Sequence, residues 1–440
     1  KANGLKIVAT AETHIHADFL SGSRELAERV GAKVYVSDEG DADWKYGWLD
    51  SKRGGGSYEH QLLKDGDRFS IGNIEIEAVH TPGHTPEHLM FKIYDKGGDA
   101  DEAMGLVTGD FVFVGDLGRP DLLETAAGFE GVKEKSAEAL YESAKKFIDL
   151  PDYLQVWPAH GAGSACGKAL GAVPSSTVGY EKRFNPALLH AQSPDEFVGF
   201  ILEGQPEPPL YFARMKQQNR DGVPLLGRLP KPEELEAGDA KALRGSQRVA
   251  VIDVRAWDEF REGHLTGALW AKLGPAFHPV AGSYVDPSQE VYLVVDDASV
   301  VEPTVRELVR IGIDKVRGFV TNETMQSIDG LVKTKELSSA ELRKGIESGE
   351  LFVLDVRRAA ENAEASIPGA ANIAHTRLPN HIDELPKDKE IVVHCRSGVR
   401  SASAASLLER EGFDVVNLAG GFIAWEQSGG KTERHEPALT

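Results

Sequence analysis

Two histidines and an aspartate near the start of the chain have the residue types and spacing of metal ligands. His14 and His16 lie two residues apart, and Asp18 follows them on a loop that comes after the apolar run 5–8. Imidazole and carboxylate groups are common ligands of transition metals. A histidine at the next position could help to hold a second metal ion, but Phe19 stands there. The motif therefore indicates one metal ion, and chemistry other than attack by a bridging hydroxide.

Three more candidate ligands, His84, Asp110 and His160, each follow a run that predicts a strand. The predicted strands are 74–79, 106–108 and 154–157. A lone histidine of this kind is more often structural. Because each of these residues lies at the carboxyl end of a strand, one sheet system can bring them to a single cleft with His14. The arrangement therefore predicts a metal centre.

A cysteine in the C-terminal part of the chain has the surroundings of a nucleophile. Cys395 directly follows an apolar strand predicted at 391–394, and a short loop closes on Arg400 and enters a predicted helix at 401–411. Loop amides and a helix N-terminus favour a thiolate and bind an anionic sulfur substrate. We expect Cys395 and Arg400 to be catalytic. The loop residues expected to contact the substrate are Arg396, Ser397, Gly398 and Val399.

Length and composition narrow the class of protein. A chain of 440 residues is too long for one hydrophobic core, so we expect roughly two to four domains. The net charge of −20 argues against nucleic acid or an anionic membrane as partner. No apolar run of roughly eighteen residues predicts a membrane span. Only two cysteines occur, which favours a cytoplasmic location. The chain starts almost directly on the metal motif, so we expect residues to precede Lys1.

The elements that position these residues fall into three parts. A connector rich in proline, glycine and charge at 224–232 places the first boundary near residue 228. An internal repeat follows, in which 251–255 is echoed by 353–357 and 266–268 by 368–370. Strand–helix–strand–helix order in both copies predicts two small α/β domains with parallel sheets. We expect a linker between them at 333–339.

The first copy of the repeat contains no cysteine. Asp296 is placed where Cys395 lies in the second copy, and Val301 falls near the position of Arg400. An acidic and an apolar side chain can neither transfer sulfur nor bind an anion there. We expect this copy to be inactive and to serve architecture or contacts between domains.

The N-terminal motifs resemble a known family. They are similar to those of the metallo-β-lactamase fold, with a departure from its hydrolases at Phe19, and further segments narrow the resemblance to persulfide dioxygenases, particularly bacterial ones fused to rhodanese domains. The matching motifs are 14–18, His84, Asp110, His160, 109–121 and 158–168. The family has strands before the first histidine motif that this chain lacks, which supports the expectation that residues precede Lys1.

The second copy of the repeat resembles a rhodanese. The resemblance is carried by the Cys395 loop and by 417–425, and it departs at Ser366, where rhodaneses often carry a histidine. Together the resemblances imply a multidomain α/β protein with an N-terminal αββα metallo-β-lactamase fold and two rhodanese-like α/β domains with parallel sheets. The implied domains are 1–228, the cysteine-less 232–328 and the active 334–432.

The resemblance also implies a ligand set. In persulfide dioxygenases two histidines and one carboxylate hold iron(II), and they correspond here to His14, His84 and Asp110. Such a set leaves open positions for O₂ and a sulfur substrate. One Fe(II) per chain is implied, although Zn or Mn could occupy the site in a crystal. The residues expected to orient ligands or substrate are His16, Asp18, His160 and Cys166. In an alternative, His16 is itself a ligand.

Two residues near these motifs are open to two interpretations. Arg119 could bind a substrate carboxylate such as that of glutathione, or it could form an ion pair with Asp116 or Asp121. Cys166 could meet the persulfide substrate, or it could be a small buried thiol.

We therefore expect a bifunctional enzyme of sulfide detoxification. An iron centre oxidises a low-molecular-weight persulfide, such as glutathione persulfide, with O₂ to sulfite, and Cys395 carries sulfur between thiosulfate, sulfite and a thiol. Two alternatives are a zinc thioester hydrolase of the glyoxalase II type fused to rhodanese, and a non-enzymatic sulfide sensor or sulfur-relay scaffold. Enzymes of this size often form symmetric dimers or tetramers, so we also expect a homo-oligomer.

Overall fold

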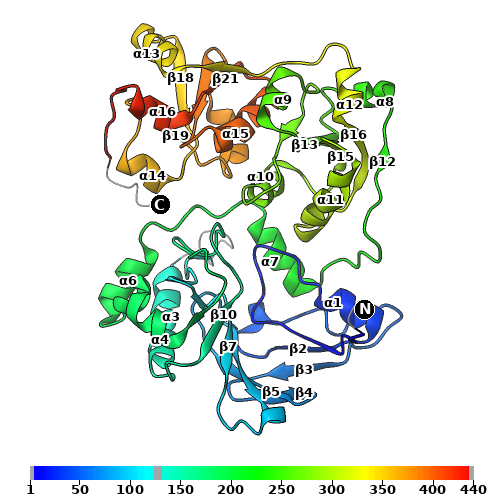
Figure 1. Cartoon of the computed structure of the whole chain (residues 1–440), viewed down its shortest axis with the longest axis vertical. Helices are drawn as coiled ribbons and strands as arrows, with labels where there is room; N and C mark the ends of the chain where they lie inside the picture. The colour runs from blue at the N-terminus through cyan, green and yellow to red at the C-terminus, as the bar shows by residue number, and fades with distance from the viewer. Residues whose placement is uncertain (1–3, 123–130, 436–440) are drawn as a thin grey trace. The chain divides into compact units, whose positions relative to one another are not determined.

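The computed structural model describes residues 4–122 and 131–435 (Figure 1). The chain forms two compact units, Lys1–Pro208 with Phe212–Gly227, and Pro209–Tyr211 with Arg228–Thr440. Within the described ranges, no helix is both long and apolar enough to cross a membrane.

The first unit alternates strands and helices. Its elements are β1 (Ala9–Ala11), α1 (Ser23–Val30), β2 (Lys33–Ser37), the 3-10 helix η1 (Ala42–Trp44), β3 (His60–Leu63), β4 (Arg68–Ile71), β5 (Ile74–His80), β6 (Leu89–Asp95), η2 (Lys96–Gly98), β7 (Gly105–Gly109), β8 (Val112–Phe113), β9 (Asp116–Leu117), α3 (Lys133–Ile148), β10 (Gln155–Pro158), β11 (Ser176–Thr177), α4 (Val178–Phe184), α5 (Pro186–Leu189), α6 (Pro194–Leu202) and α7 (Phe212–Asp221).

These elements build the four-layer αββα sandwich that the resemblance implied. A six-stranded sheet of order β11-β10-β7-β6-β5-β4 faces a three-stranded parallel sheet of order β1-β2-β3. Between the two sheets, Tyr35 and Leu63 of the small sheet pack with Phe69, Ala78 and Phe91 of the large one. Their apolar side chains point to one face of each strand, as the two-residue period of a strand requires.

Helices cover the outer faces of both sheets. Leu106 and Val156 of the large sheet are buried with residues of α3, α4, α5 and α6, and α3, α4 and α6 lie beside β7 and β10 in Figure 1. Val34 and Val36 of the small sheet are buried with Ala27 of α1. The first unit thus has one hydrophobic layer between its sheets and one beneath each helical layer.

The candidate metal ligands follow four strands of this sandwich. His14 comes after β1, His84 after β5, Asp110 after β7 and His160 after β10. Strands β5 and β7 are both antiparallel to β6, and β10 is parallel to β7, so β5, β7 and β10 run in the same direction. Their carboxyl ends therefore meet at one edge of the large sheet, as the sequence pattern predicted.

The second unit contains two copies of one sheet topology. Its elements are β12 (Glu233–Glu234), α8 (Ala237–Ala242), β13 (Val249–Asp253), α9 (Trp257–Glu262), β14 (Leu269–Trp270), α10 (Phe277–Tyr284), β15 (Glu290–Val295), η3 (Ala298–Val300), α11 (Val301–Arg310), β16 (Val316–Thr321), α12 (Asn322–Gln326), β17 (Lys335–Leu337), α13 (Ser339–Ser348), β18 (Leu351–Asp355), α14 (Ala359–Glu364), β19 (Ala371–Asn372), η4 (Leu378–Glu384), β20 (Glu390–His394), α15 (Val399–Arg410), β21 (Val415–Leu418) and α16 (Gly421–Gln427).

The two strand orders are equivalent, β12-β16-β15-β13-β14 and β17-β21-β20-β18-β19, and the pairings in both sheets are parallel. The same buried ion pair follows the same strand in each copy. Arg255 binds Asp253 through Nε and Nη2, and Arg357 binds Asp355 in the same way. The sequence repeat is therefore a structural repeat.

The structure corrects two details of the repeat. The strand register gives Val294 the position that His394 holds in the second copy, so Val295, and not Asp296, corresponds to Cys395. The first copy has a valine in place of the cysteine, so its apolar run ends one residue later than in the second copy. The predicted linker is also shorter than 333–339, because Lys335–Leu337 forms β17, which pairs with β21.

Candidate metal centre and sulfur-transfer loop

Three predicted ligands converge in the first unit. His14, His84 and Asp110 are almost completely buried, and one potential ligand atom of each lies within 4.8 Å of the others. Asp110 Oδ2 is 3.5 Å from His84 Nε2 and 3.9 Å from His14 Nε2. In the described part of the chain, neither carboxylate oxygen of Asp110 has a hydrogen-bond partner. A buried, unsatisfied carboxylate beside two imidazole nitrogens is the donor set of a metal site.

The other ring nitrogens of the two histidines are held by the protein. His84 Nδ1 lies 3.0 Å from the carbonyl oxygen of Arg119, which can only accept, so Nδ1 carries the proton. His14 Nδ1 lies 2.9 Å from the Thr13 hydroxyl. These bonds leave Nε2 of His84 with a free electron pair, as a metal ligand requires.

Burial and neighbouring charges together set the ionisation of the three groups. Burial lowers the pKa of His14 and His84 below the usual value, so both rings are neutral near pH 7. Burial alone would raise the pKa of Asp110, but the neighbouring His160 and His14 outweigh it and hold that pKa well below its usual range. Neutral imidazoles and an ionised carboxylate are the protonation states in which these groups bind a metal.

A second group of donor atoms lies beside the first. Asp18, His160 and Cys166 also have one atom each within 4.8 Å of one another. His160 Nε2 is 3.0 Å from Asp18 Oδ2 and 3.4 Å from Asp110 Oδ1, so it connects the two groups. Burial and the charge of Asp110 raise the pKa of Cys166 to about 12, which keeps this thiol protonated. Phe19 supplies no donor side chain here.

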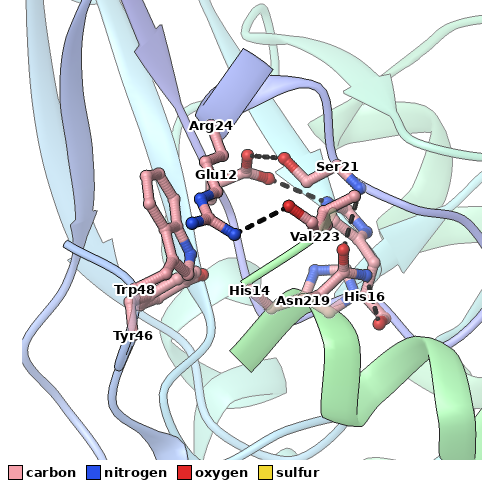
Figure 2. A pocket seen from close by; sticks show the side chains of 9 residues that line it. All are labelled: Glu12, His14, His16, Ser21, Arg24, Tyr46, Trp48, Asn219 and Val223. Carbon is pink, nitrogen blue, oxygen red and sulfur yellow. Dashed lines mark hydrogen bonds and ion pairs between the residues drawn. The ribbon is translucent and has the colours of Figure 1, made fainter. Parts of the chain in front are cut away.

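His16 faces a carboxylate that the sequence did not single out. Its Nε2 lies 3.3 Å from Glu12 Oε2, and Figure 2 shows dashed lines from the Glu12 carboxylate to both His16 and Ser21. Burial would lower the pKa of His16, but Glu12 outweighs it and raises that pKa to about 9. Among the described residues His16 belongs to neither donor group, so the arrangement favours an orienting role over a ligand role.

The loop that carries His16 is also tied to α7. The Asn219 amide donates to the carbonyl oxygens of His16 and Phe19, and its Oδ1 accepts from the Ser21 N–H. Sequence reasoning missed Glu12 and Asn219. A carboxylate two residues before His14 was a weak signal for Glu12, whereas Asn219 lies about 200 residues away and offered none.

Arg119 does not have the position of a substrate clamp. Its side chain is 1% exposed, and its Nε and Nη2 donate to the two carboxylate oxygens of Asp121. Nη1 donates to the carbonyl oxygens of Ala165 and Pro206. The prediction that Arg119 binds substrate is therefore wrong for this structure, and the ion pair with Asp121 is the correct interpretation. A buried, bidentate pair fixes the loop whose carbonyl orients His84.

A cleft of about 510 Å³ opens beside the metal ligands. His16, Asp18 and His160 line it, and the Phe19 ring forms part of its wall. A small molecule in this cleft would meet the orienting residues and an apolar surface.

In the second unit, the Cys395 loop has the predicted form. The buried Sγ of Cys395 accepts a hydrogen bond from the Gly398 N–H at 3.2 Å and one from the Ser401 hydroxyl at 3.5 Å. Gly398 has a φ of 101° and directly precedes α15. Arg396, Ser397 and Val399 are exposed around the loop. Donors aimed at sulfur at a helix N-terminus stabilise a thiolate or a persulfide anion.

Arg400 is held by a residue that the sequence analysis did not name. Its Nη1 and Nη2 bind the two oxygens of Glu361 at 2.6 and 2.8 Å. Glu361 follows Asp355 by six residues within the repeat, so the repeat was the signal that could have identified Glu361.

At Ser366, the hydroxyl lies 3.0 Å from Nε2 of His435, so a histidine from the C-terminal segment contacts this position.

Comparisons with known proteins agree with this geometry. Residues 1–160 match the family described as Metallo-beta-lactamase superfamily, and residues 338–428 match the Rhodanese-like domain. The solved structure of a metallo-beta-lactamase from Staphylococcus aureus subsp. aureus COL is 37% identical and covers 73% of this chain and 87% of that chain, with a TM-score of 0.64. The chain belongs to the metallo-β-lactamase superfamily. In this metallo-β-lactamase superfamily protein, a rhodanese-like domain forms the C-terminal part.

Curated relatives match each part separately. A "Probable metallo-hydrolase" of Burkholderia pseudomallei (strain 1710b) is 30% identical over 53% of this chain and 77% of its own length. A "Sulfurtransferase" of Allochromatium vinosum is 36% identical over 21% of this chain and 90% of its own length. The chain spans only 50% of the "Beta-lactamase hydrolase-like protein" of Agrobacterium fabrum, to which it is 31% identical.

Proposed function

We propose that this protein oxidises a low-molecular-weight persulfide at the His14–His84–Asp110 centre and transfers sulfur through Cys395. The convergence of two neutral imidazoles and one buried carboxylate without a hydrogen-bond partner among the described residues carries the first half of the proposal. The set fits a divalent metal, and two histidines with one carboxylate are typical of iron(II) oxygenases. When bound, iron(II) would supply the O₂ chemistry, in which persulfide, O₂ and water give thiol, sulfite and two protons.

The residues around the centre would bind and orient the substrate. The cleft beside His16, Asp18 and His160 offers space for a thiol carrier such as glutathione, and Phe19 lines it with an apolar side chain. Glu12 and Asn219 would keep the His16 loop in place during the reaction.

The Cys395 loop supports the second half of the proposal. The Cys395 thiolate would attack the sulfane sulfur of thiosulfate, whose S–S bond breaks so that sulfite leaves with the electron pair. A thiolate acceptor would then attack the outer sulfur of the Cys395 persulfide, which forms a new persulfide and restores the Cys395 thiolate. The same steps run in reverse would form thiosulfate from sulfite.

The test is O₂ consumption by the iron-loaded full chain on glutathione persulfide, together with the metal content. We expect one iron per chain, O₂ uptake and sulfite. Turnover of glutathione persulfide with no O₂ uptake would contradict the proposal.

One observation favours a second candidate, a zinc-dependent thioester hydrolase. Asp18, His160 and Cys166 offer further donor atoms beside the first group, which would suit a second metal ion. Two zinc ions per chain, with thioester cleavage that consumes no O₂, would identify this alternative.

A further inference from the structure

The helix that starts at the catalytic loop contacts the cysteine-less repeat at its other end. Helix α15 begins just after Cys395, and at its other end Arg410 donates from Nη1 to the Gly267 carbonyl at 2.7 Å and from Nη2 to the Val249 carbonyl at 3.0 Å. Both carbonyls belong to the first copy of the repeat. The catalytic helix is therefore held at its C-terminal end by the copy that lacks a nucleophile.

The middle of α15 is part of the same contact. The Ser406 hydroxyl accepts the N–H of Trp270, a residue of β14 in the first copy. The side chain of Ala402 is buried in the hydrophobic cluster of that copy, with Trp270 and Val251. Helix α15 therefore adds Ala402 to the hydrophobic cluster of the first copy.

A third contact between the copies involves a segment of the second copy near Arg400. The Tyr284 hydroxyl of α10 in the first copy donates to the His375 carbonyl in the second copy at 3.0 Å. His375 lies close enough to the catalytic loop that, besides burial, the charge of Arg400 helps to lower its pKa to about 3. The first copy thus contacts both the helix and a segment that flank the nucleophile.

We infer that the cysteine-less repeat is a positioning element for sulfur transfer, which fixes α15 and the His375 segment around Cys395. The inference rests on the proposed sulfur transfer. The hydrogen bond from Gly398 to sulfur depends on where α15 begins, and a shift of about 1 Å at a reacting group costs on the order of a hundredfold in rate. Arg410 and Tyr284 act through the helix and the loop and touch no substrate.

The test compares two variants with two controls in the full-length protein. Tyr284→Phe removes one hydroxyl between the copies, and Tyr292→Phe makes the same change at a half-buried tyrosine of the first copy. Arg410→Ala releases the end of α15, and Arg310→Ala changes the last residue of α11, which pairs with Glu307 in its own copy. Two measurements are made, kcat/KM for sulfur transfer from thiosulfate to cyanide, and the pH profile of Cys395 alkylation followed by mass spectrometry.

We expect Arg410→Ala to lower kcat/KM about tenfold and Tyr284→Phe severalfold. Both should move the midpoint of the Cys395 alkylation profile, while the controls stay at wild-type values. Variants that lose only thermal stability, or that match their controls in both measurements, would overturn the inference. If Arg410→Ala does not fold, the conservative variant Tyr284→Phe tests the inference by itself. A wild-type chain that transfers no sulfur would refute the proposed function, and the alkylation profile would still test the positioning.

Discussion

Nε2 of His88 accepts a hydrogen bond from the backbone N–H of Asp110 at 3.1 Å. Nδ1 of the same ring lies 2.8 Å from the Thr81 hydroxyl, to which it donates its proton. Burial lowers the pKa of His88 to about 3, so the ring stays neutral and keeps Nε2 as an acceptor. A histidine that belongs to neither donor group thus fixes the carboxylate of the metal centre.

His88→Phe should therefore weaken metal binding without removing a ligand. We expect a loss of about 10- to 100-fold in metal affinity, the usual effect of losing a partner that orients a ligand. Competition with a chelator measures it. His190→Phe, which changes an exposed histidine of the same unit, is the control. Equal affinities of the two variants would show that His88 only fills space.

Glu87 should make the stability of the metal-free protein depend on pH. Burial raises the pKa of Glu87 from 4.5 to about 7, while its Oε1 accepts the Ile15 N–H at 2.7 Å. A raised pKa in the folded state adds stability that is complete below pH 4.5 and is lost as the pH rises through about 7.

Glu87→Gln keeps an acceptor for Ile15 but cannot ionise. Between pH 5 and pH 7.5, the wild type should lose more unfolding free energy than the variant, by at most about 3 kcal/mol. Urea denaturation of both proteins at the two pH values measures the difference. Parallel stability profiles would mean that Glu87 does not titrate in this range.

The Arg119→Lys variant distinguishes a structural ion pair from a role of Arg119 in substrate binding. Lysine cannot form the bidentate pair with Asp121, so the free energy of unfolding should fall by about 2–4 kcal/mol. The KM for glutathione persulfide should stay within about twofold, because in this structure the guanidinium does not face the cleft. A raised KM with unchanged stability would restore the clamp interpretation.

Gly421→Ala should disable sulfur transfer. An added Cβ at this position would lie 2.6 Å from the Cys395 carbonyl oxygen and 2.8 Å from that of Arg396, and the φ of 60° is unfavourable for alanine. The catalytic loop must shift, and we expect at least a tenfold loss in kcat/KM for transfer, with O₂ uptake unchanged. Gly412→Ala, at another positive φ with no atom within 4 Å of the added Cβ, controls for backbone strain.

The metal ligands could be predicted because they occupy strand ends. His84 and Asp110 follow strands of the large sheet that run in the same direction, so their ends meet at one edge, and His14 follows a strand of the small sheet. The repeat was visible for the same reason, since its strands and its Asp–Arg pairs recur at fixed intervals. Such signals are local, and a single sequence carries them.

Partners that meet only through the fold could not be predicted. Glu87 and Ile15 are 72 residues apart, and nothing local marks one as the acceptor of the other. For Arg119, the sequence allowed either an ion pair with a nearby aspartate or a contact with substrate in a cleft. Only the burial of the side chain and the carbonyl oxygens around it distinguish the two. The role of the cysteine-less copy likewise depends on where α15 packs, which no motif in that copy reveals.

The most direct test of the account measures O₂ uptake on glutathione persulfide and sulfur transfer in two iron-loaded variants. His84→Ala removes a ligand of the metal centre, and Cys395→Ser removes the nucleophile of the second unit. We predict that His84→Ala loses O₂ uptake and keeps sulfur transfer, while Cys395→Ser keeps O₂ uptake and loses transfer. O₂ uptake that survives in His84→Ala would contradict the assigned metal centre. The loss of both activities in either variant would contradict two separate sites.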